Sequence, residues 1–277
     1  MAKKVSKLDE AGIKKAVRKG YANVAKSGGC GCGCGPSDCA GEMSKSVGYS
    51  EKEMAEVPDG ANLGLGCGNP VALASLKKGE TVMDLGSGAG FDAFLAANRV
   101  GNTGRVIGVD MTPEMLDKAR ANAKKGKYAN VEFRLGEIEN LPAADNSVDV
   151  IISNCVINLA PDKDRVFCEA ARVLKKGGRL MVSDIVLLKP LPKPVMDSMR
   201  AYVGCLSGAI MKDGYIKSIG KAGFKNVKVL EENHYPVEYV MDDATAKELG
   251  EAVKLTKKDA DALAKAIVSV KVSAVKK

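Results

Sequence analysis

The stretch that decides the fold is Thr81-Val-Met-Asp-Leu-Gly-Ser-Gly-Ala-Gly90, an apolar run that leads through three glycines into a helical pattern. Glycines at these positions let the backbone turn tightly and approach a ligand without intervening Cβ atoms. The next β-branched run, Arg105-Val-Ile-Gly-Val-Asp110, ends in a carboxylate 24 residues after Gly86. A carboxylate there can accept hydrogen bonds from both ribose hydroxyls of an adenosine ligand. The pattern therefore predicts nucleotide-type binding on a strand, loop and helix.

Short β-branched runs alternate with helical patterns through the middle of the chain. We expect strands near 81–85, 105–109, 131–135, 148–153 and 179–186, and helices near 91–98, 113–125 and 162–174. Such alternation predicts an α/β fold with right-handed crossovers, a mostly parallel sheet and helices on both faces. Outside this region we expect helices over 8–24 and 194–222, strands over 226–231 and 235–240, and surface helices within 243–277.

The charge distribution argues against a nucleic-acid partner. The formal net charge is +8, but residues 1–26 carry eight Lys and Arg against two acids, and residues 243–277 carry eight against five. The middle of the chain is close to neutral, and aromatic residues make up only 4% of the sequence. A nucleic-acid groove would need clustered cations with stacking aromatics between them.

We expect the eight cysteines to bind metals or to react as thiols rather than to form structural disulfides. No apolar run of about 18 residues or apolar signal core is found, so we expect a cytoplasmic protein without a membrane partner. In that reducing compartment, cysteines more often bind metals or react. Four of them lie in a glycine-rich arm, namely Cys30, Cys32, Cys34 and Cys39.

The other four cysteines differ in their surroundings. Cys67 is flanked by glycines shortly before the first strand, and Cys155 follows Asn154 at the end of the fourth. Ligands of open α/β sheets bind outside the carboxyl ends of strands one and four, so Cys155 is expected beside the ligand. Cys205 lies in the predicted helical region after the fifth strand. Cys168 is expected to be a small buried side chain inside a helix.

The glycine loop resembles the first motif of class I methyltransferases. The spacing Gly86-x-Gly88-x-Gly90 differs from the dinucleotide fingerprint, and no Lys or Arg lies nearby for a pyrophosphate. The resemblance implies a Rossmann-like sheet that binds S-adenosylmethionine. It implies that the loop holds the methionine end and that Glu137 and Ile138 lie beside the adenine. The cofactor set that we expect is Asp84, Gly86, Ser87, Gly88, Gly90, Asp110, Met111, Glu137, Ile138 and Asn154.

Three stretches resemble the arsenite S-adenosylmethionine methyltransferases in particular: Asn62-Leu-Gly-Leu-Gly-Cys-Gly-Asn-Pro-Val71, Gly108-Val-Asp-Met-Thr-Pro-Glu-Met-Leu116 and Ile152-Ser-Asn-Cys-Val-Ile-Asn-Leu159. The resemblance implies that Cys67, Cys155 and Cys205 coordinate trivalent arsenic, which is thiophilic. It also implies a relay cysteine in the arm, for which Cys30 and Cys32 are candidates. The family usually has a compact pair where this chain has Cys-Gly-Cys-Gly-Cys, so the relay member stays open.

We expect the chain to divide into three segments. Residues 1–60 form a helix and a cysteine-rich arm, 61–190 form the cofactor-binding core, and 191–277 cover the arsenic site and add terminal strands and a helical tail. We expect a monomer that takes arsenite or its thiol conjugates. The resemblance further implies that enzyme thiols reduce the arsenic after methyl transfer and that thioredoxin or glutathione restores them.

Two other functions would share parts of this sequence pattern. A quinone- or sterol-type C- or O-methyltransferase shares the sheet but leaves the three separate cysteines unexplained. A metalloid sensor would bind arsenite without consuming the cofactor. C-x-C-x-C lacks the usual spacing of zinc modules, and the single histidine, His234, favours a structural role over that of a base.

Overall fold

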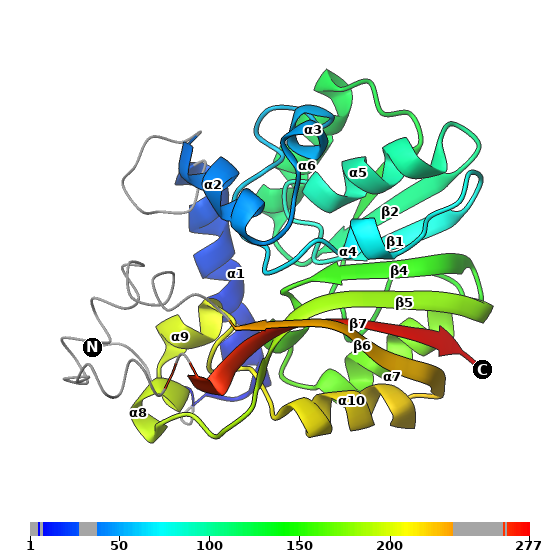
Figure 1. The fold of residues 1–277 in the computed structure, drawn as a ribbon. Coiled ribbons are helices and arrows are strands. Elements are labelled where there is room, and N and C mark those ends of the chain that lie inside the picture. Colours follow the sequence, from blue (N-terminus) through cyan, green and yellow to red (C-terminus); the bar gives the residue numbers. More distant parts are fainter. Residues whose placement is uncertain (1–4, 6–7, 28–37, 235–262, 264) are drawn as a thin grey trace.

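A seven-stranded sheet forms the centre of the computed structural model, which describes residues 5, 8–27, 38–234, 263 and 265–277 (Figure 1). The strand order is β3-β2-β1-β4-β5-β7-β6. The strands are β1 (Thr81–Leu85), β2 (Arg105–Asp110), β3 (Val131–Leu135), β4 (Val148–Asn154), β5 (Leu174–Leu187), β6 (Phe224–His234) and β7 (Ile267–Lys276). The first five strands pair in parallel, whereas β7 runs antiparallel to both β5 and β6. The predicted Rossmann-like, mostly parallel sheet is confirmed.

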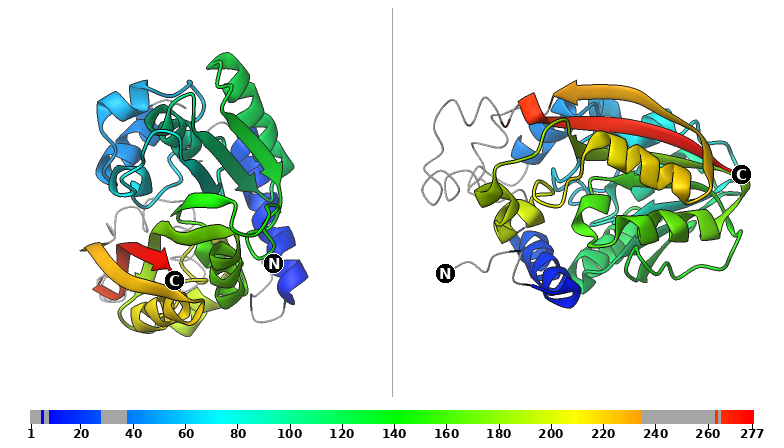
Figure 2. Two further views of the ribbon diagram at one scale, coloured as in Figure 1. Left: turned by 90° about the vertical axis from the view of Figure 1, so that its right-hand side faces the viewer. Right: turned by 90° about the horizontal axis from the view of Figure 1, so that it is seen from below.

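Helices cover both faces of the sheet, as the alternating pattern predicted (Figures 1 and 2). One face carries α4 (Pro70–Leu73), α5 (Phe91–Val100) and α6 (Pro113–Lys125) over an apolar layer that contains Val82, Val106 and Val150. The opposite face carries α7 (Lys163–Val173) and α10 (Lys212–Lys221) over a second layer that contains Met83, Ile107 and Ile151. Because successive strand residues point to opposite faces, a strand buried on both sides is apolar throughout.

The helix α1 (Glu10–Ser27) stands across one end of the sheet (Figure 1). It packs against α6 and against α9 (Met199–Val203), which come from opposite sides of the molecule. The remaining helices are short: α2 (Asp38–Ser46), α3 (Glu51–Ala55), a 3₁₀ turn η2 (Ile157–Leu159) and α8 (Lys193–Met196). Within the described ranges, no helix is both long enough and apolar enough to cross a membrane.

The C-terminal part differs most from the sequence-based prediction. We expected surface helices within 243–277, but Ile267–Lys276 is the strand β7, buried between β5 and β6. The helix expected over 194–222 is three separate helices, α8, α9 and α10. A strand over 226–231 is confirmed within the longer β6, whereas the strand expected over 235–240 lies outside the described residues.

The N-terminal arm is described only in part. Cys39 belongs to helix α2, so the predicted glycine-rich loop ends before it. Cys30, Cys32 and Cys34 fall in the range 28–37, outside the described residues. The division into segments 1–60, 61–190 and 191–277 stays a prediction.

Candidate active site

A pocket opens at the carboxyl ends of β1, β2 and β4, where the switch in strand order lies. Its walls come from the glycine loop after β1, from the segment that precedes Cys67 and from the residues that follow Asn154. Lys14, Val17 and Tyr21 of α1 line it as well. This is the place where open α/β sheets bind their ligands.

The glycine loop turns sharply between β1 and α5. Gly86, Gly88 and Gly90 all have positive φ angles, 69°, 50° and 99°. At Gly90, a Cβ atom would lie 2.6 Å from the ring of Phe94 and 2.9 Å from that of Phe133. A larger residue at Gly90 would therefore displace the start of α5 from the sheet.

Three carboxyl groups, two of them buried and the third, that of Asp110, partly buried, give the pocket an acidic wall. Burial, and then the neighbouring carboxyls of Asp92 and Asp110, raise the pKa of Asp84 well above its usual range. Burial also raises the pKa of Asp110, and it raises that of Asp92 to about 6. Carboxyl groups held this close resist simultaneous ionisation. A positively charged ligand would relieve that repulsion.

Two polar atoms of this pocket lack partners in the described structure. The Oδ2 atom of Asp84 and the Oγ atom of Ser87 are buried without a hydrogen bond. Such atoms are rare in folded proteins unless a ligand or water satisfies them. Both residues belong to the predicted cofactor set, and both are suited to polar groups of a ligand.

Asp110 ends β2 as predicted and ties the glycine loop to that strand. Its Oδ2 accepts a hydrogen bond of 3.0 Å from the Gly88 backbone N–H, and its Oδ1 accepts one of 2.8 Å from Thr112. The carboxylate also lines the pocket. Each oxygen has a second lone pair, so the group can still accept from a bound ligand.

Asn154 connects the pocket to the segment of Cys67. Its Oδ1 accepts a hydrogen bond of 3.0 Å from the Cys67 backbone N–H. Its Nδ2 lies 2.8 Å from the Tyr49 hydroxyl and 3.0 Å from Asp92 Oδ2. The Tyr49 hydroxyl in turn donates to Asp92 Oδ1 over 2.6 Å. Sequence reasoning missed Tyr49 and Asp92, because neither belongs to a motif and only the fold brings them to Asn154.

The structure brings most of the predicted cofactor residues to this pocket. The members that line it are Asp84, Gly86, Ser87, Gly88, Asp110, Met111, Ile138 and Asn154. Glu137 is not among the lining residues, since its carboxylate pairs with Lys14 over 2.8 Å and with Arg18 over 3.6 Å. Gly90 does not line the pocket either and is the N-cap of α5. Their roles toward a cofactor stay predictions.

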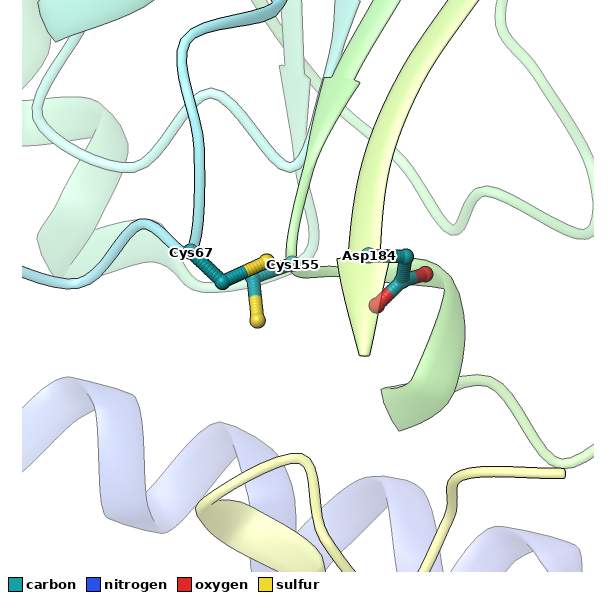
Figure 3. Close-up of side chains that lie close together, drawn as sticks. All are labelled: Cys67, Cys155 and Asp184. Carbon is teal, nitrogen blue, oxygen red and sulfur yellow. The ribbon is translucent and has the colours of Figure 1, made fainter. Parts of the chain in front are cut away.

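The three separated cysteines converge at one end of this pocket. All three are buried, and Cys155 lines the pocket wall. The sulfurs of Cys67 and Cys155 and an oxygen of Asp184 lie within 4.8 Å of one another (Figure 3). Cys205 lies in the turn after α9, and its thiol donates to the Cys155 carbonyl over 2.9 Å. Residues far apart in the sequence thus form one thiol cluster.

Two thiols of this cluster, those of Cys155 and Cys67, hold their protons firmly. Contacts with the thiols of Cys205 and Cys67, and burial, raise the pKa of Cys155 well above its usual value. Burial raises the pKa of Cys67. A thiophilic ion binds thiolates, so binding at this cluster must release the thiol protons. The cluster suits a ligand that carries its own proton acceptors.

Asp184 is the acid that sequence reasoning missed. Burial raises its pKa to about 7, and it accepts hydrogen bonds from Asn158 Nδ2 over 2.8 Å and from the Tyr215 hydroxyl over 3.1 Å. Its position at the end of β5, one strand from Cys155, follows from the sheet order. In the sequence, Ser183-Asp184 belongs to no motif that would mark the acid as a site residue.

Two other predicted side chains lie outside the site. Cys168 is exposed on α7, so the expectation of a buried side chain is wrong. It lies off the apolar stripe formed by Val166, Ala170 and Val173. His234 is exposed at the end of β6.

The sheet and its pocket match a family of known proteins. The family described as "Methyltransferase domain" matches residues 76–234, which include the glycine loop and most of the sheet. The chain belongs to the methyltransferase domain family. Within this family it is 47% identical to an arsenite methyltransferase of Halobacterium salinarum, over 89% of the chain and 66% of that protein. An arsenite methyltransferase of Aquipseudomonas alcaligenes is 42% identical over 68% of the chain and 55% of its own length.

The methyltransferase domain also has a solved structural relative. The arsenic (III) S-adenosylmethionine methyltransferase of Chlamydomonas reinhardtii matches with a TM-score of 0.62 and 33% identity, over 85% of the chain and 73% of that protein. The chain spans between about half and two thirds of the length of the two curated relatives.

Proposed function

We propose that the chain transfers a methyl group from S-adenosylmethionine to trivalent arsenic held by its thiols. The observation that carries this proposal is the convergence of buried thiols on the pocket wall, with two sulfurs and the Asp184 carboxylate within 4.8 Å of one another. The similarity to arsenite methyltransferases supports it. A quinone-type methyltransferase needs no such cluster.

The pocket suits S-adenosylmethionine. This cofactor, when bound, supplies an electrophilic methyl group on a sulfonium that carries a positive charge. The acidic wall and the unpartnered atoms of Asp84 and Ser87 favour its cationic methionine end. Asp110 would accept the ribose hydroxyls, and Ile138 would pack beside the adenine. Of the described cations, only Lys14 lines the pocket, and it is paired with Glu137 and Glu139, which argues against a pyrophosphate.

Arsenite brings the proton acceptors that the neutral thiols need. Each hydroxide of the acid leaves arsenic with one thiol proton as water, while one arsenic–oxygen bond breaks and one arsenic–sulfur bond forms. Three such exchanges at Cys67, Cys155 and Cys205 leave a neutral arsenic with a free lone pair. Cys155 lines the pocket, so arsenic bound to it lies at the wall of the cofactor site. Positioning then does most of the catalysis, since an attacking lone pair needs no base.

Methyl transfer formally oxidises arsenic from the trivalent to the pentavalent state. Two enzyme thiols that close a disulfide supply the two electrons that return it. Cys30 and Cys32 of the arm are our candidates for this relay. Thioredoxin or glutathione reopens the disulfide, as the reducing cytoplasm allows. We expect the enzyme to work as a monomer.

The experiment is incubation of the chain with arsenite, S-adenosylmethionine and a thiol reductant, followed by speciation of arsenic. We expect methylated arsenic and S-adenosylhomocysteine in equal amounts after the first turnover. Cys155→Ser should abolish the product, whereas Cys168→Ser, which changes an exposed thiol, should not. Cofactor binding without methylated arsenic would refute the proposal in favour of the quinone type. Arsenite binding without cofactor consumption would favour a sensor.

A further inference from the structure

The C-terminal strand β7 reaches the cysteine cluster. Ser269, near the start of β7, is buried, and its hydroxyl donates a hydrogen bond of 2.7 Å to the backbone carbonyl of Cys67. The two residues are 202 positions apart in the sequence. β7 is fixed on both edges by β5 and β6, so this hydroxyl has a rigid support.

The opposite side of the same loop is held by β4. Asn154 accepts from the Cys67 N–H over 3.0 Å, and its Nδ2 donates to the Gly68 carbonyl over 2.8 Å. The backbone N–H and carbonyl of Cys67 thus each have a partner on a different strand. A loop residue with both backbone groups fixed keeps its side chain in one direction.

The glycines beside Cys67 allow this close seating. A Cβ atom at Gly66 would lie 2.5 Å from Asn154 Nδ2. A Cβ atom at Gly68 would overlap the Ser183 hydroxyl on β5 and lie 3.3 Å from Lys271 Cε on β7. Any side chain at these positions would lift the loop from the three strands and move the Cys67 thiol away from Cys155.

We propose that Ser269 is a positioning residue for Cys67, so that β7 belongs to the thiol site. The inference rests on the proposed function, since it concerns how Cys67 is held for arsenic. A fixed Cys67 sulfur spares the ordering that would otherwise oppose three-coordinate binding. Neither Ser269 nor Cys67 lines the cofactor pocket, so we expect loss of this hydroxyl to affect arsenite binding and not S-adenosylmethionine affinity.

The test compares Ser269→Ala with Ser273→Ala, which removes a hydroxyl from the same strand away from Cys67. Three quantities are measured: arsenite affinity without cofactor, the alkylation rate of Cys67 relative to Cys155 by mass spectrometry, and S-adenosylmethionine affinity. We expect Ser269→Ala to weaken arsenite binding and to accelerate Cys67 alkylation, each about fivefold, as for the loss of one hydrogen bond. Cofactor affinity should not change, and Ser273→Ala should resemble the parent in all three measurements.

A second pair of variants controls for poor folding of Ser269→Ala. Ser269→Thr and Ser269→Val have nearly equal shapes, and only threonine keeps the hydroxyl, so threonine should bind arsenite about fivefold more tightly than valine. Unchanged Cys67 alkylation in Ser269→Ala, or a parallel loss of cofactor affinity, would overturn the inference. A parent protein that binds no arsenite would overturn the proposed function, while the alkylation rates would still decide whether Ser269 holds Cys67.

Discussion

The thiol of Cys205 donates a hydrogen bond to the backbone carbonyl of Cys155, with 2.9 Å between the two atoms. Both residues have left-handed backbones, with φ of 65° at Cys205 and 57° at Cys155. Such angles are uncommon for residues with a Cβ atom and cluster at functional sites. Each of the two cysteines thus has a left-handed backbone at the place where the two residues contact each other.

Replacing Cys205 separates its two roles. Cys205→Ser keeps a hydroxyl donor for the Cys155 carbonyl but loses the proposed thiolate ligand of arsenic, so arsenic methylation should fall by at least about 100-fold with little change in stability. Cys205→Ala leaves that buried carbonyl unpaired and should cost roughly 1 kcal/mol more of unfolding free energy than serine. Urea denaturation and arsenic speciation measure the two effects. Equal stabilities would mean that the hydrogen bond contributes nothing.

The backbone of Cys155 predicts an unusual order of stabilities. Glycine adopts a φ of 57° without strain, whereas alanine does not, so Cys155→Gly should be more stable than Cys155→Ala by about 1 kcal/mol. The control is the same pair of substitutions at Cys67, which is not among the positive-φ residues and should favour alanine. Thermal or urea unfolding of the four variants gives the comparison. An alanine preference at both positions would contradict the expectation.

Asp184 should make stability depend on pH. Burial raises its native pKa to about 7, against about 3.9 for an unfolded aspartate. The native state therefore keeps this proton longer than the unfolded state does. The contribution is fully present below about pH 4 and is lost as the pH rises through about 7.

The measurement is the unfolding free energy of the parent and of Asp184→Asn from pH 4 to pH 8. Asparagine does not titrate, so the difference between parent and variant should fall across this range, by at most about 1.4 kcal/mol per pH unit, and then level off. A difference that is constant with pH would show that Asp184 is ionised throughout.

The position of β7 predicts which C-terminal side chains matter. Val270 is fully buried between β5 and β6, whereas Val275 near the end of the strand is half-buried. Val270→Ala should cost about 2 kcal/mol and Val275→Ala less than about 1 kcal/mol. Urea denaturation compares them. Equal costs would mean that β7 is not the buried strand described.

The sequence-based prediction was wrong at β7 and correct at the glycine loop, for different physical reasons. The loop is specified locally, because strand, glycines and helix follow one another within residues 81–100, and the next strand ends in the carboxylate of Asp110. In 243–277 the Ala- and Lys-rich composition favours helix, although Ile267–Lys276 alternates in a period of two along part of its length. Burial between two strands decided the outcome there, and a single sequence does not show which strands are neighbours.

The site residues that belong to a sequence motif could be predicted from the sequence. The end of the fourth strand predicted Cys155 beside the pocket, and the resemblance to arsenite methyltransferases implied that Cys67 joins it. Asp184, Tyr49 and Ser269 were not expected. They reach the site through sheet order and through loops that cross it, and no spacing in the sequence records such distant contacts.

Asp110 offers a test of the cofactor pocket that is independent of arsenic. Its carboxylate holds the Gly88 and Thr112 backbone N–H groups and lines the pocket, so Asp110→Ala loses both the loop contacts and the proposed acceptor for the ribose hydroxyls. We expect S-adenosylmethionine affinity, measured by calorimetry, to fall about 100-fold, as for two hydrogen bonds to a charged group. Asp110→Asn keeps one acceptor and should lose less. Glu137→Gln tests separately the adenine contact that the resemblance implies. Glu137 does not line the described pocket, so we expect a smaller loss there, and a loss equal to that of Asp110→Ala would place the adenosine against Glu137.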